Sequence, residues 1–250
     1  MNNPKQNFFL TKNNQKIHYK FINNKSLTTI IFLHGLMSNI KSKKAKHLKK
    51  FANENKINLL LFEYSGHGRS SGKFTDFSIK NWVEDSRSII KKLINKNKIV
   101  LIGSSMGAWI AILLIKHFYK RIKGFIAIAP APDFTEELIW KKLNDIEKIK
   151  IKKNKIYKLK SSRNNFYPIT KKFIFDGKKI LVLNKKINCS FPVELLHGIK
   201  DSSVSWVYSI KLIKTLISKK LSLTFIDDGD HSLSRAQDLK KLDLAIKNII

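Results

Sequence analysis

The chain has one cysteine and no long apolar run, and each of these features excludes a class of protein. A lone Cys189 excludes an internal disulfide framework and fits a reducing compartment. No stretch reaches the roughly 18 apolar residues of a bilayer-spanning helix, and residues 1–10 lack the cationic and apolar regions of a signal peptide. Spacings of histidine and cysteine typical of zinc sites are also missing. We therefore expect a soluble, cytoplasmic protein with no metal and no cofactor.

Acidic residues are scarce, because 18 Asp and Glu stand against 49 Lys and Arg, a net charge of +31. Such an excess is typical of proteins that bind polyanions. Here, however, the lysines are spread over the whole length and are not interleaved with aromatic residues, as a nucleic-acid platform requires. We interpret the excess as compositional. It predicts weak attraction to anionic membranes or polyanions and no specific nucleic-acid partner.

Apolar runs alternate with helical patterns along most of the 250 residues. A hairpin is expected over Asn7–Phe21. Buried strands are expected at Thr28–Leu33, Leu59–Phe62, Ile99–Ile102, Gly124–Ala129, Val193–Leu196 and Leu223–Ile226. Helices are expected at Lys43–Glu54, Phe77–Leu93, Trp206–Ile217 and Leu239–Ile250, and directly after Gly107. This alternation predicts one α/β domain over residues 1–250, with a mostly parallel sheet of about eight strands flanked by helices.

The alternation stops between Asp133 and about residue 190. Leu138–Ile149 has the pattern of a helix, Lys150–Lys160 is rich in lysine, and Asp176-Gly177 is typical of a turn. We interpret residues 133–190, hereafter the insertion, as a lid over the carboxyl ends of the strands. The alternative is a disordered basic loop, which the apolar residues of the insertion argue against.

One glycine-serine motif lies between a predicted strand and a predicted helix. The residues Gly103-Ser104-Ser105-Met106-Gly107 form a G-x-S-x-G pattern. In this context the pattern predicts a sharp turn in which the central Ser105 is strained and its hydroxyl exposed. Ser104 lacks glycines at both flanking positions. The sequence therefore predicts Ser105 as a nucleophile at the carboxyl end of the sheet.

An aspartate and a histidine follow the last two predicted strands. Asp201 ends His197-Gly198-Ile199-Lys200-Asp201, and His231 follows the final strand. The order Ser, Asp, His is that of α/β-hydrolases. A hydroxyl is a weak nucleophile unless a base removes its proton, and a carboxylate orients that base. Asp228 and Asp230 remain alternatives to Asp201 as the acid.

The negative oxygen formed by such an attack requires hydrogen-bond donors. The backbone N–H groups of Leu36, after His34-Gly35, and of Met106, after Ser105, are predicted to supply them. We interpret His34 and His197 as structural, because each precedes a glycine at a strand end.

The motifs together resemble those of the α/β-hydrolases. More narrowly, the chain is similar to the group that contains the mitochondrial α/β-hydrolase domain-containing protein 10 and its proteobacterial relatives. The resemblance rests on residues 34–38, 64–68, 103–109, 195–201 with Val204 and Trp206, and 228–234. The chain departs from the group at Glu63, Ser202 and Ser205, where we expect aspartate, an acidic residue and proline.

The resemblance implies a serine hydrolase that cleaves acyl thioesters or esters, with S-palmitoylated proteins or small acyl compounds as substrates. It assigns Ser105 as nucleophile, Asp201 as acid, His231 as base, and Leu36 and Met106 as oxyanion-hole amides. Alternatives are a carboxylesterase, peptidase or C–C hydrolase with the same triad. A non-catalytic protein that binds anionic partners through its basic surface is another. The sequence does not indicate an oligomeric state.

Overall fold

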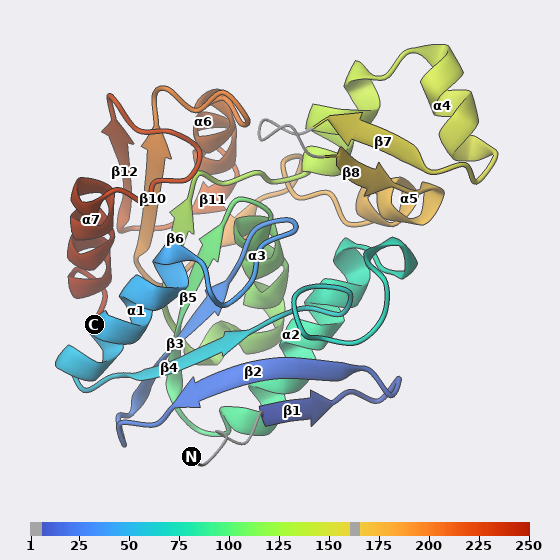
Figure 1. The fold of residues 1–250 in the computed structure, drawn as a ribbon. Coiled ribbons are helices and arrows are strands. Elements are labelled where there is room, and N and C mark those ends of the chain that lie inside the picture. Colours follow the sequence, from blue (N-terminus) through green and yellow to red (C-terminus); the bar gives the residue numbers. More distant parts are fainter. Residues whose placement is uncertain (1–6, 161–165) are drawn as a thin grey trace.

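A mostly parallel eight-stranded sheet forms the centre of the chain in the computed structural model, which describes residues 7–160 and 166–250 (Figure 1). Residues 1–6, part of the N-terminal stretch considered above, and residues 161–165 of the insertion lie outside the described residues. In spatial order the strands are β1 (Asn7–Leu10), β2 (Lys16–Ile22), β4 (Asn58–Phe62), β3 (Thr28–Leu33), β5 (Lys98–Ser104), β6 (Ile122–Ile128), β10 (Val193–Gly198) and β12 (Leu221–Ile226). Within this sheet, only the β1–β2 and β2–β4 pairs are antiparallel. The predicted α/β fold is confirmed.

Helices cover both faces of the sheet, as Figure 1 shows. On one face lie α1 (Lys43–Glu54) and α7 (Ala236–Lys247), and on the other lie α2 (Ile79–Leu93) and α3 (Met106–Phe118). Alternate strand residues point to opposite faces. Ile30 and Phe32 of β3 accordingly pack with α1 and α7, whereas Ile31 and Leu33 pack with α2 and α3. Both faces are buried, which explains the continuous apolar runs of the parallel strands.

The remaining elements are short. They are the 3₁₀ turns η1 (Phe74–Asp76) and η2 (Tyr119–Arg121), helix α6 (Val207–Ile213), and the strand β11 (Leu216–Ile217), which pairs with β9 (Ile187–Asn188). Among the residues that the structure describes, no helix is both long and apolar enough to cross a membrane.

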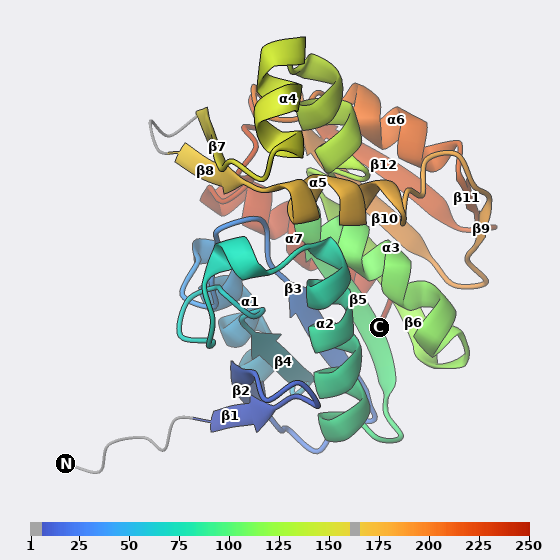
Figure 2. The same ribbon diagram turned by 90° about the vertical axis from the view of Figure 1, so that its right-hand side faces the viewer.

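The insertion contains more elements than expected. They are the π-helix η3 (Thr135–Ile139), the 3₁₀ turn η4 (Trp140–Lys142), α4 (Asp145–Lys152), the antiparallel pair β7 (Tyr157–Lys160) and β8 (Phe166–Ile169), α5 (Lys171–Lys178), and β9. Figure 2 shows α4, β7 and β8 above the helices that cover the sheet.

The single helix expected over Leu138–Ile149 is wrong. Asn144 interrupts it, because its side chain accepts a hydrogen bond from the Glu147 N–H at 2.9 Å. The Glu147 carboxylate in turn accepts from the Asn144 N–H, also at 2.9 Å. This reciprocal capping box begins a new helix at this point.

The turn expected at Asp176-Gly177 is also wrong, since both residues lie inside α5. The Ser78 hydroxyl donates to the Asp176 carboxylate at 2.7 Å. Gly177 permits close approach to η3, because a Cβ atom there would lie 2.2 Å from the Thr135 hydroxyl oxygen. Asp176 and Gly177 therefore contact neighbouring elements from within α5 and do not form a turn.

Several predicted helix boundaries differ from the structure, and two of the differences have a clear cause. The helix expected over Trp206–Ile217 ends at Ile213, and Thr215 then accepts a hydrogen bond from the Ile187 N–H at 2.8 Å, which leads the chain into β11. Helix α7 begins earlier than predicted, at Ala236, because the Asp238 carboxylate accepts from the Arg235 N–H at 2.9 Å.

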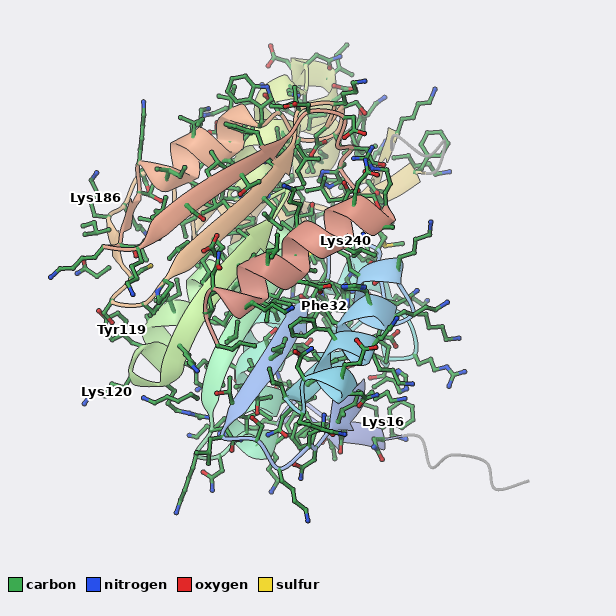
Figure 3. The ribbon with its side chains drawn as sticks, turned by 90° about the vertical axis from the view of Figure 1, so that its left-hand side faces the viewer. Lys16, Phe32, Tyr119, Lys120, Lys186 and Lys240 are labelled. Atoms are coloured by element: carbon green, nitrogen blue, oxygen red, sulfur yellow. The ribbon has the colours of Figure 1, made fainter. Side chains whose placement is uncertain are left out.

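Basic side chains project from several separate elements. Figure 3 shows Lys16, Lys120, Lys186 and Lys240 projecting outward from separate elements, while Phe32 lies inside. Cys189 is buried, and burial raises the pKa of its thiol to about 11.

Asp133 closes the base of the insertion. It follows β6, and its buried carboxylate accepts hydrogen bonds from the N–H groups of Val182 at 2.9 Å and Leu183 at 2.9 Å. The carboxylate therefore joins the start of the insertion to its returning end.

We predict that Asp133→Ala lowers the free energy of unfolding by roughly 2–4 kcal/mol, because two N–H groups lose their acceptor. The exposed Asp227→Ala should change it by less than about 0.5 kcal/mol. Urea denaturation measures both. Equal stability of the two variants would contradict the role of Asp133.

Candidate active site

Ser105 occupies a strained turn between β5 and α3. Its backbone has φ 55° and ψ −120°, a region that side-chain-bearing residues rarely adopt. The Ser105 N–H donates to the Ile128 carbonyl at 2.9 Å, and the Ser105 carbonyl accepts from Ala108 at 3.0 Å and Ala131 at 3.3 Å. Hydrogen bonds from β6, from α3 and from the residues after β6 thus hold the strained residue in place.

The two glycines of the motif allow α3 to approach the sheet. A Cβ atom on Gly103 would lie 2.5 Å from the Ala108 Cα. A Cβ atom on Gly107 would lie 1.9 Å from the Leu33 carbonyl oxygen at the end of β3. Neither position can therefore carry a side chain without a backbone shift.

The structure brings Ser105, His231 and Asp201 together from three loops at the carboxyl ends of β5, β12 and β10. The distance from His231 Nε2 to Ser105 Oγ is 3.1 Å. On the other side of the ring, His231 Nδ1 lies 2.6 Å from Asp201 Oδ2. A carboxylate only accepts, so Nδ1 carries the proton and Nε2 of the neutral ring is free to accept the serine proton.

Backbone contacts fix the two outer loops relative to each other. The Lys200 N–H donates to the Gly229 carbonyl at 3.0 Å. Gly198 makes room for this contact, because a Cβ atom there would lie 2.2 Å from the same carbonyl oxygen. The loops that carry Asp201 and His231 therefore form one unit.

Four donors surround the Asp201 carboxylate. Oδ1 accepts from the N–H groups of Ser203 at 2.9 Å and Val204 at 2.8 Å, whereas Oδ2 accepts from His231 and, at 3.2 Å, from His197. Burial by itself would raise the pKa of Asp201, but the hydrogen bonds from His197 and His231 outweigh it and hold this pKa well below its ordinary value. Asp201 is therefore ionised at neutral pH.

The hydrogen bond from His197 to Asp201 was not predicted from the sequence. The ring is fully buried, and Nε2 also lies 2.9 Å from the Val204 carbonyl. A carbonyl only accepts, so Nε2 carries a proton and donates to both oxygens. Nδ1 lies 2.7 Å from the Ser209 hydroxyl, which donates to it when the ring is neutral. The position of His197 four residues before Asp201 is the sequence feature that could have indicated this contact.

The alternative acids have other partners. Asp228 forms a bidentate pair with Arg235 at 2.6 and 2.9 Å, and Asp230 accepts from the Leu233 N–H at 2.9 Å. Two other histidines also contact carboxylates: His18 lies 2.9 Å from Glu63, and His47 lies 2.6 Å from Asp243.

His34 and Gly35 place the backbone beside Ser105. His34 is buried, and its Nδ1 lies 2.8 Å from the Gly35 carbonyl. Burial lowers the pKa of His34 to about 3, so the ring is neutral. A Cβ atom on Gly35 would lie 3.4 Å from Ser105 Cβ. Leu36 follows directly, and Met106 is the first residue of α3, so the backbone segments of both flank Ser105.

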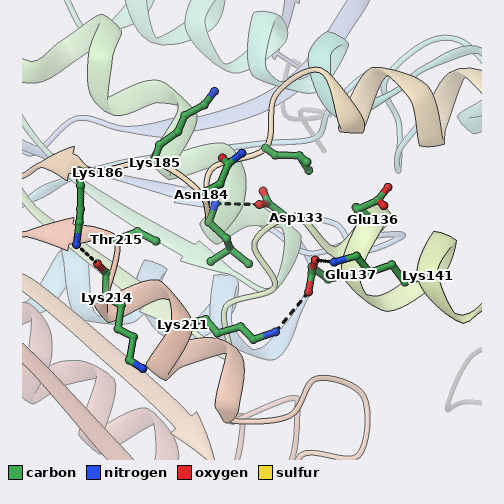
Figure 4. A pocket seen from close by; sticks show the side chains of 12 residues that line it. Asp133, Glu136, Glu137, Lys141, Asn184, Lys185, Lys186, Lys211, Lys214 and Thr215 are labelled. Atoms are coloured by element: carbon green, nitrogen blue, oxygen red, sulfur yellow. Dashed lines mark hydrogen bonds and ion pairs between the residues drawn. The ribbon is translucent and has the colours of Figure 1, made fainter.

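A cavity of about 750 Å³ lies between the insertion and α6, shown in Figure 4, and its lining contains none of Ser105, Asp201 and His231. On its wall, the Glu137 carboxylate pairs with both Lys141 and, at 3.4 Å, Lys211. Within residues 7–160 and 166–250, no group of three or more His, Cys, Asp or Glu side chains is arranged to hold a metal ion.

The family profile described as "Serine aminopeptidase, S33" (Hydrolase_4) matches residues 24–172. The chain belongs to this family. A putative hydrolase from Agrobacterium vitis S4 has a similar structure, with a TM-score of 0.93, 31% identity and 98% of each chain covered. The α/β-hydrolase domain-containing protein 10 from mouse superimposes with a TM-score of 0.88 at 26% identity, covering 98% of this chain and 97% of that one.

Among curated sequences, the rat protein named "Palmitoyl-protein thioesterase ABHD10, mitochondrial" is 28% identical over 222 residues, which cover 88% of this chain and 74% of the rat protein. The expected resemblance is confirmed: the chain is a hydrolase of the α/β-hydrolase fold, similar to ABHD10.

We predict that Gly107→Ala lowers the free energy of unfolding by at least about 3 kcal/mol, since the added methyl would overlap the Leu33 carbonyl. Gly35→Ala, where a methyl makes ordinary contacts, should lower it by less than about 1 kcal/mol. Chemical denaturation compares the two variants. A Gly107→Ala protein as stable as the parent would show that α3 does not require this close approach.

Proposed function

We propose that the chain hydrolyses acyl thioesters or esters through a Ser105–His231–Asp201 triad and a covalent acyl-enzyme. The observation that carries the proposal is the continuous contact from Ser105 Oγ to His231 at 3.1 Å and on to Asp201 at 2.6 Å. The family assignment supports hydrolysis, but the roles of the three residues are inferred from their geometry.

In the first step, Ser105 Oγ attacks the carbonyl carbon while His231 Nε2 takes the hydroxyl proton. The tetrahedral intermediate then collapses, and the bond from carbon to the thiol or alcohol leaving group breaks. His231 returns its proton to that leaving group. Water, activated by the same histidine, then cleaves the acyl-serine ester, releasing the acid and restoring Ser105.

Two features stabilise the charges that develop. Ionised Asp201 stabilises the imidazolium form of His231, since the carboxylate already lies against Nδ1. The backbone N–H groups of Leu36 and Met106 are proposed to donate to the oxyanion, because Gly35 and the first turn of α3 flank Ser105.

The substrate class is proposed from the relatives. The rat and human proteins are both named as palmitoyl-protein thioesterases, so an acylated protein or a small acyl thioester or ester is the substrate that we favour. We also propose that the insertion acts as a lid. Its anchor Asp133 lies two residues after Ala131, whose N–H donates to the Ser105 carbonyl.

We predict that Ser105→Ala lowers kcat for acyl thioesters by more than about 10⁴-fold, because no other group can form the acyl-enzyme. Ser104→Ala, next to it in the same turn, is the matched control and should retain most activity. Unchanged hydrolysis by Ser105→Ala would exclude the proposed nucleophile.

The leaving group is tested with a thioester, an oxygen ester and an amide that share one acyl chain. The proposal expects turnover of the thioester and the ester, and little of the amide. Faster cleavage of the amide would instead favour a peptidase that uses the same three residues.

We predict that His197→Leu lowers kcat/KM about tenfold, the equivalent of one charge-assisted hydrogen bond of about 1.5 kcal/mol. Losing this donor makes Asp201 more basic, which favours the imidazolium form of His231. The acidic limb of the pH profile of kcat/KM should therefore move to higher pH.

His197→Gln is the matched control, because its amide N–H reaches toward the position of Nε2. It should restore the pH profile toward that of the parent. Loss of activity in His197→Leu with an unmoved acidic limb would mean that the residue only supports the fold.

A further inference from the structure

We propose that the insertion carries a docking surface for anionic lipid membranes, formed by α4 and the β7–β8 hairpin. The apolar members of this docking surface are Ile146, Ile149, Ile156 and Phe166, and its basic members are Lys150, Lys153, Lys155, Lys158 and Lys160. The proposal concerns binding, and it holds whether or not the chain hydrolyses acyl compounds.

Helix α4 presents apolar side chains to solvent. Ile146 is 67% exposed and Ile149 is 48% exposed, whereas Ile151 is fully buried. Residues three apart lie on one face of a helix, so Ile146 and Ile149 project together while Ile151 packs on the core. Figures 1 and 2 show α4 at the outer limit of the molecule. Helix α4 therefore packs one apolar face on the core and exposes a second apolar face to solvent.

The hairpin continues this arrangement. Phe166 is 57% exposed and lies directly opposite Lys160 in the β7–β8 register, so the two side chains project from the same face. The opposite face carries Leu159 and Tyr167, which pack against the core. Exposed apolar and basic groups therefore stand side by side on the hairpin as well.

A direct contact holds the helix and the hairpin together. The Tyr157 hydroxyl of β7 donates to the Glu147 carboxylate of α4 at 2.6 Å. Between these elements lies Ile156, which is 55% exposed. The segment thus presents its exposed groups from one connected unit.

The charge of this segment identifies the partner. Residues 141–160 contain nine lysines and two acidic residues, a net charge of +7 in 20 residues, against +31 in all 250. Lysines around exposed aliphatic side chains are typical of helices that lie in the interface of an anionic bilayer. RNA-binding surfaces instead use several aromatic rings for base stacking. Phe166 is the one exposed large aromatic residue within the described part of the insertion, which favours lipid.

The test measures binding of the full-length protein to vesicles by co-sedimentation, with phosphatidylcholine alone or mixed with phosphatidylserine at about 30%. The proposal expects binding only to the mixed vesicles. The double variant Ile146→Ser, Ile149→Ser should lower the partition coefficient at least tenfold. The control Leu27→Ser, Leu244→Ser removes two apolar side chains elsewhere on the surface that are 86% and 56% exposed, more than Ile146 and Ile149 respectively are, and should change the partition coefficient less than twofold.

A second pair of variants separates local charge from the overall charge of +31. Lys150→Gln, Lys153→Gln on the docking surface should weaken binding at least fivefold. Lys240→Gln, Lys241→Gln removes the same charge from exposed positions of α7 and should weaken binding less than twofold. Activity on a soluble short-chain thioester should be unchanged in every variant, which keeps this test separate from that of the hydrolase.

If a docking-surface variant and its matched control lost vesicle binding equally, the proposal would be overturned. Binding would then depend on the total charge or the general apolarity of the surface. Binding to neutral vesicles as strong as to anionic ones would also overturn it. So would preferential binding of a mixed single-stranded RNA over anionic vesicles, with loss in the lysine variants and none in the isoleucine variants.

Discussion

The site depends on one backbone constraint, the reversal from β5 into α3 at Ser105. A residue with a side chain stands at φ 55°, and hydrogen bonds to its own N–H and carbonyl from neighbouring elements hold it there. The reversal is possible because Gly103 and Gly107 let the helix contact the sheet at distances that exclude a Cβ atom. The strain at Ser105 is thus offset by packing of α3 against the end of β3.

A second feature is the ionised carboxylate of Asp201. Two backbone N–H groups and two imidazoles donate to it, so both oxygens are fixed before any substrate arrives. The carboxylate accepts a hydrogen bond from Nδ1 of His231 and thereby orients the ring. In this orientation, Nε2 faces Ser105 Oγ and can accept its proton. Electrostatic preorganisation of this kind lowers the reorganisation needed during a reaction. His197, fully buried behind the carboxylate, belongs to this arrangement even though it does not contact Ser105 Oγ.

The sheet and its covering helices could be predicted from the sequence because both faces are buried and the apolar periodicity is strong. The region 133–190 was predicted less well. The Asn144–Glu147 capping box is a local signal that begins a helix inside the continuous apolar pattern, and the pattern alone did not show it. The Asp176 carboxylate, by contrast, accepts from the distant Ser78, a contact that no local pattern reveals. The G-x-S-x-G turn was evident because its glycines are required locally. The hydrogen bond from His197 to Asp201 was not, because it depends on how the loop after β10 folds back.

The most direct test of the central claim is to locate the nucleophile chemically. The folded protein is treated with a fluorophosphonate, which phosphonylates activated serines with loss of fluoride, and the modified peptide is identified by mass spectrometry. We expect a single adduct on Ser105, and none after His231→Ala removes the base. An adduct on another serine, or no adduct on a protein shown to be folded, would contradict the role of Ser105 as nucleophile.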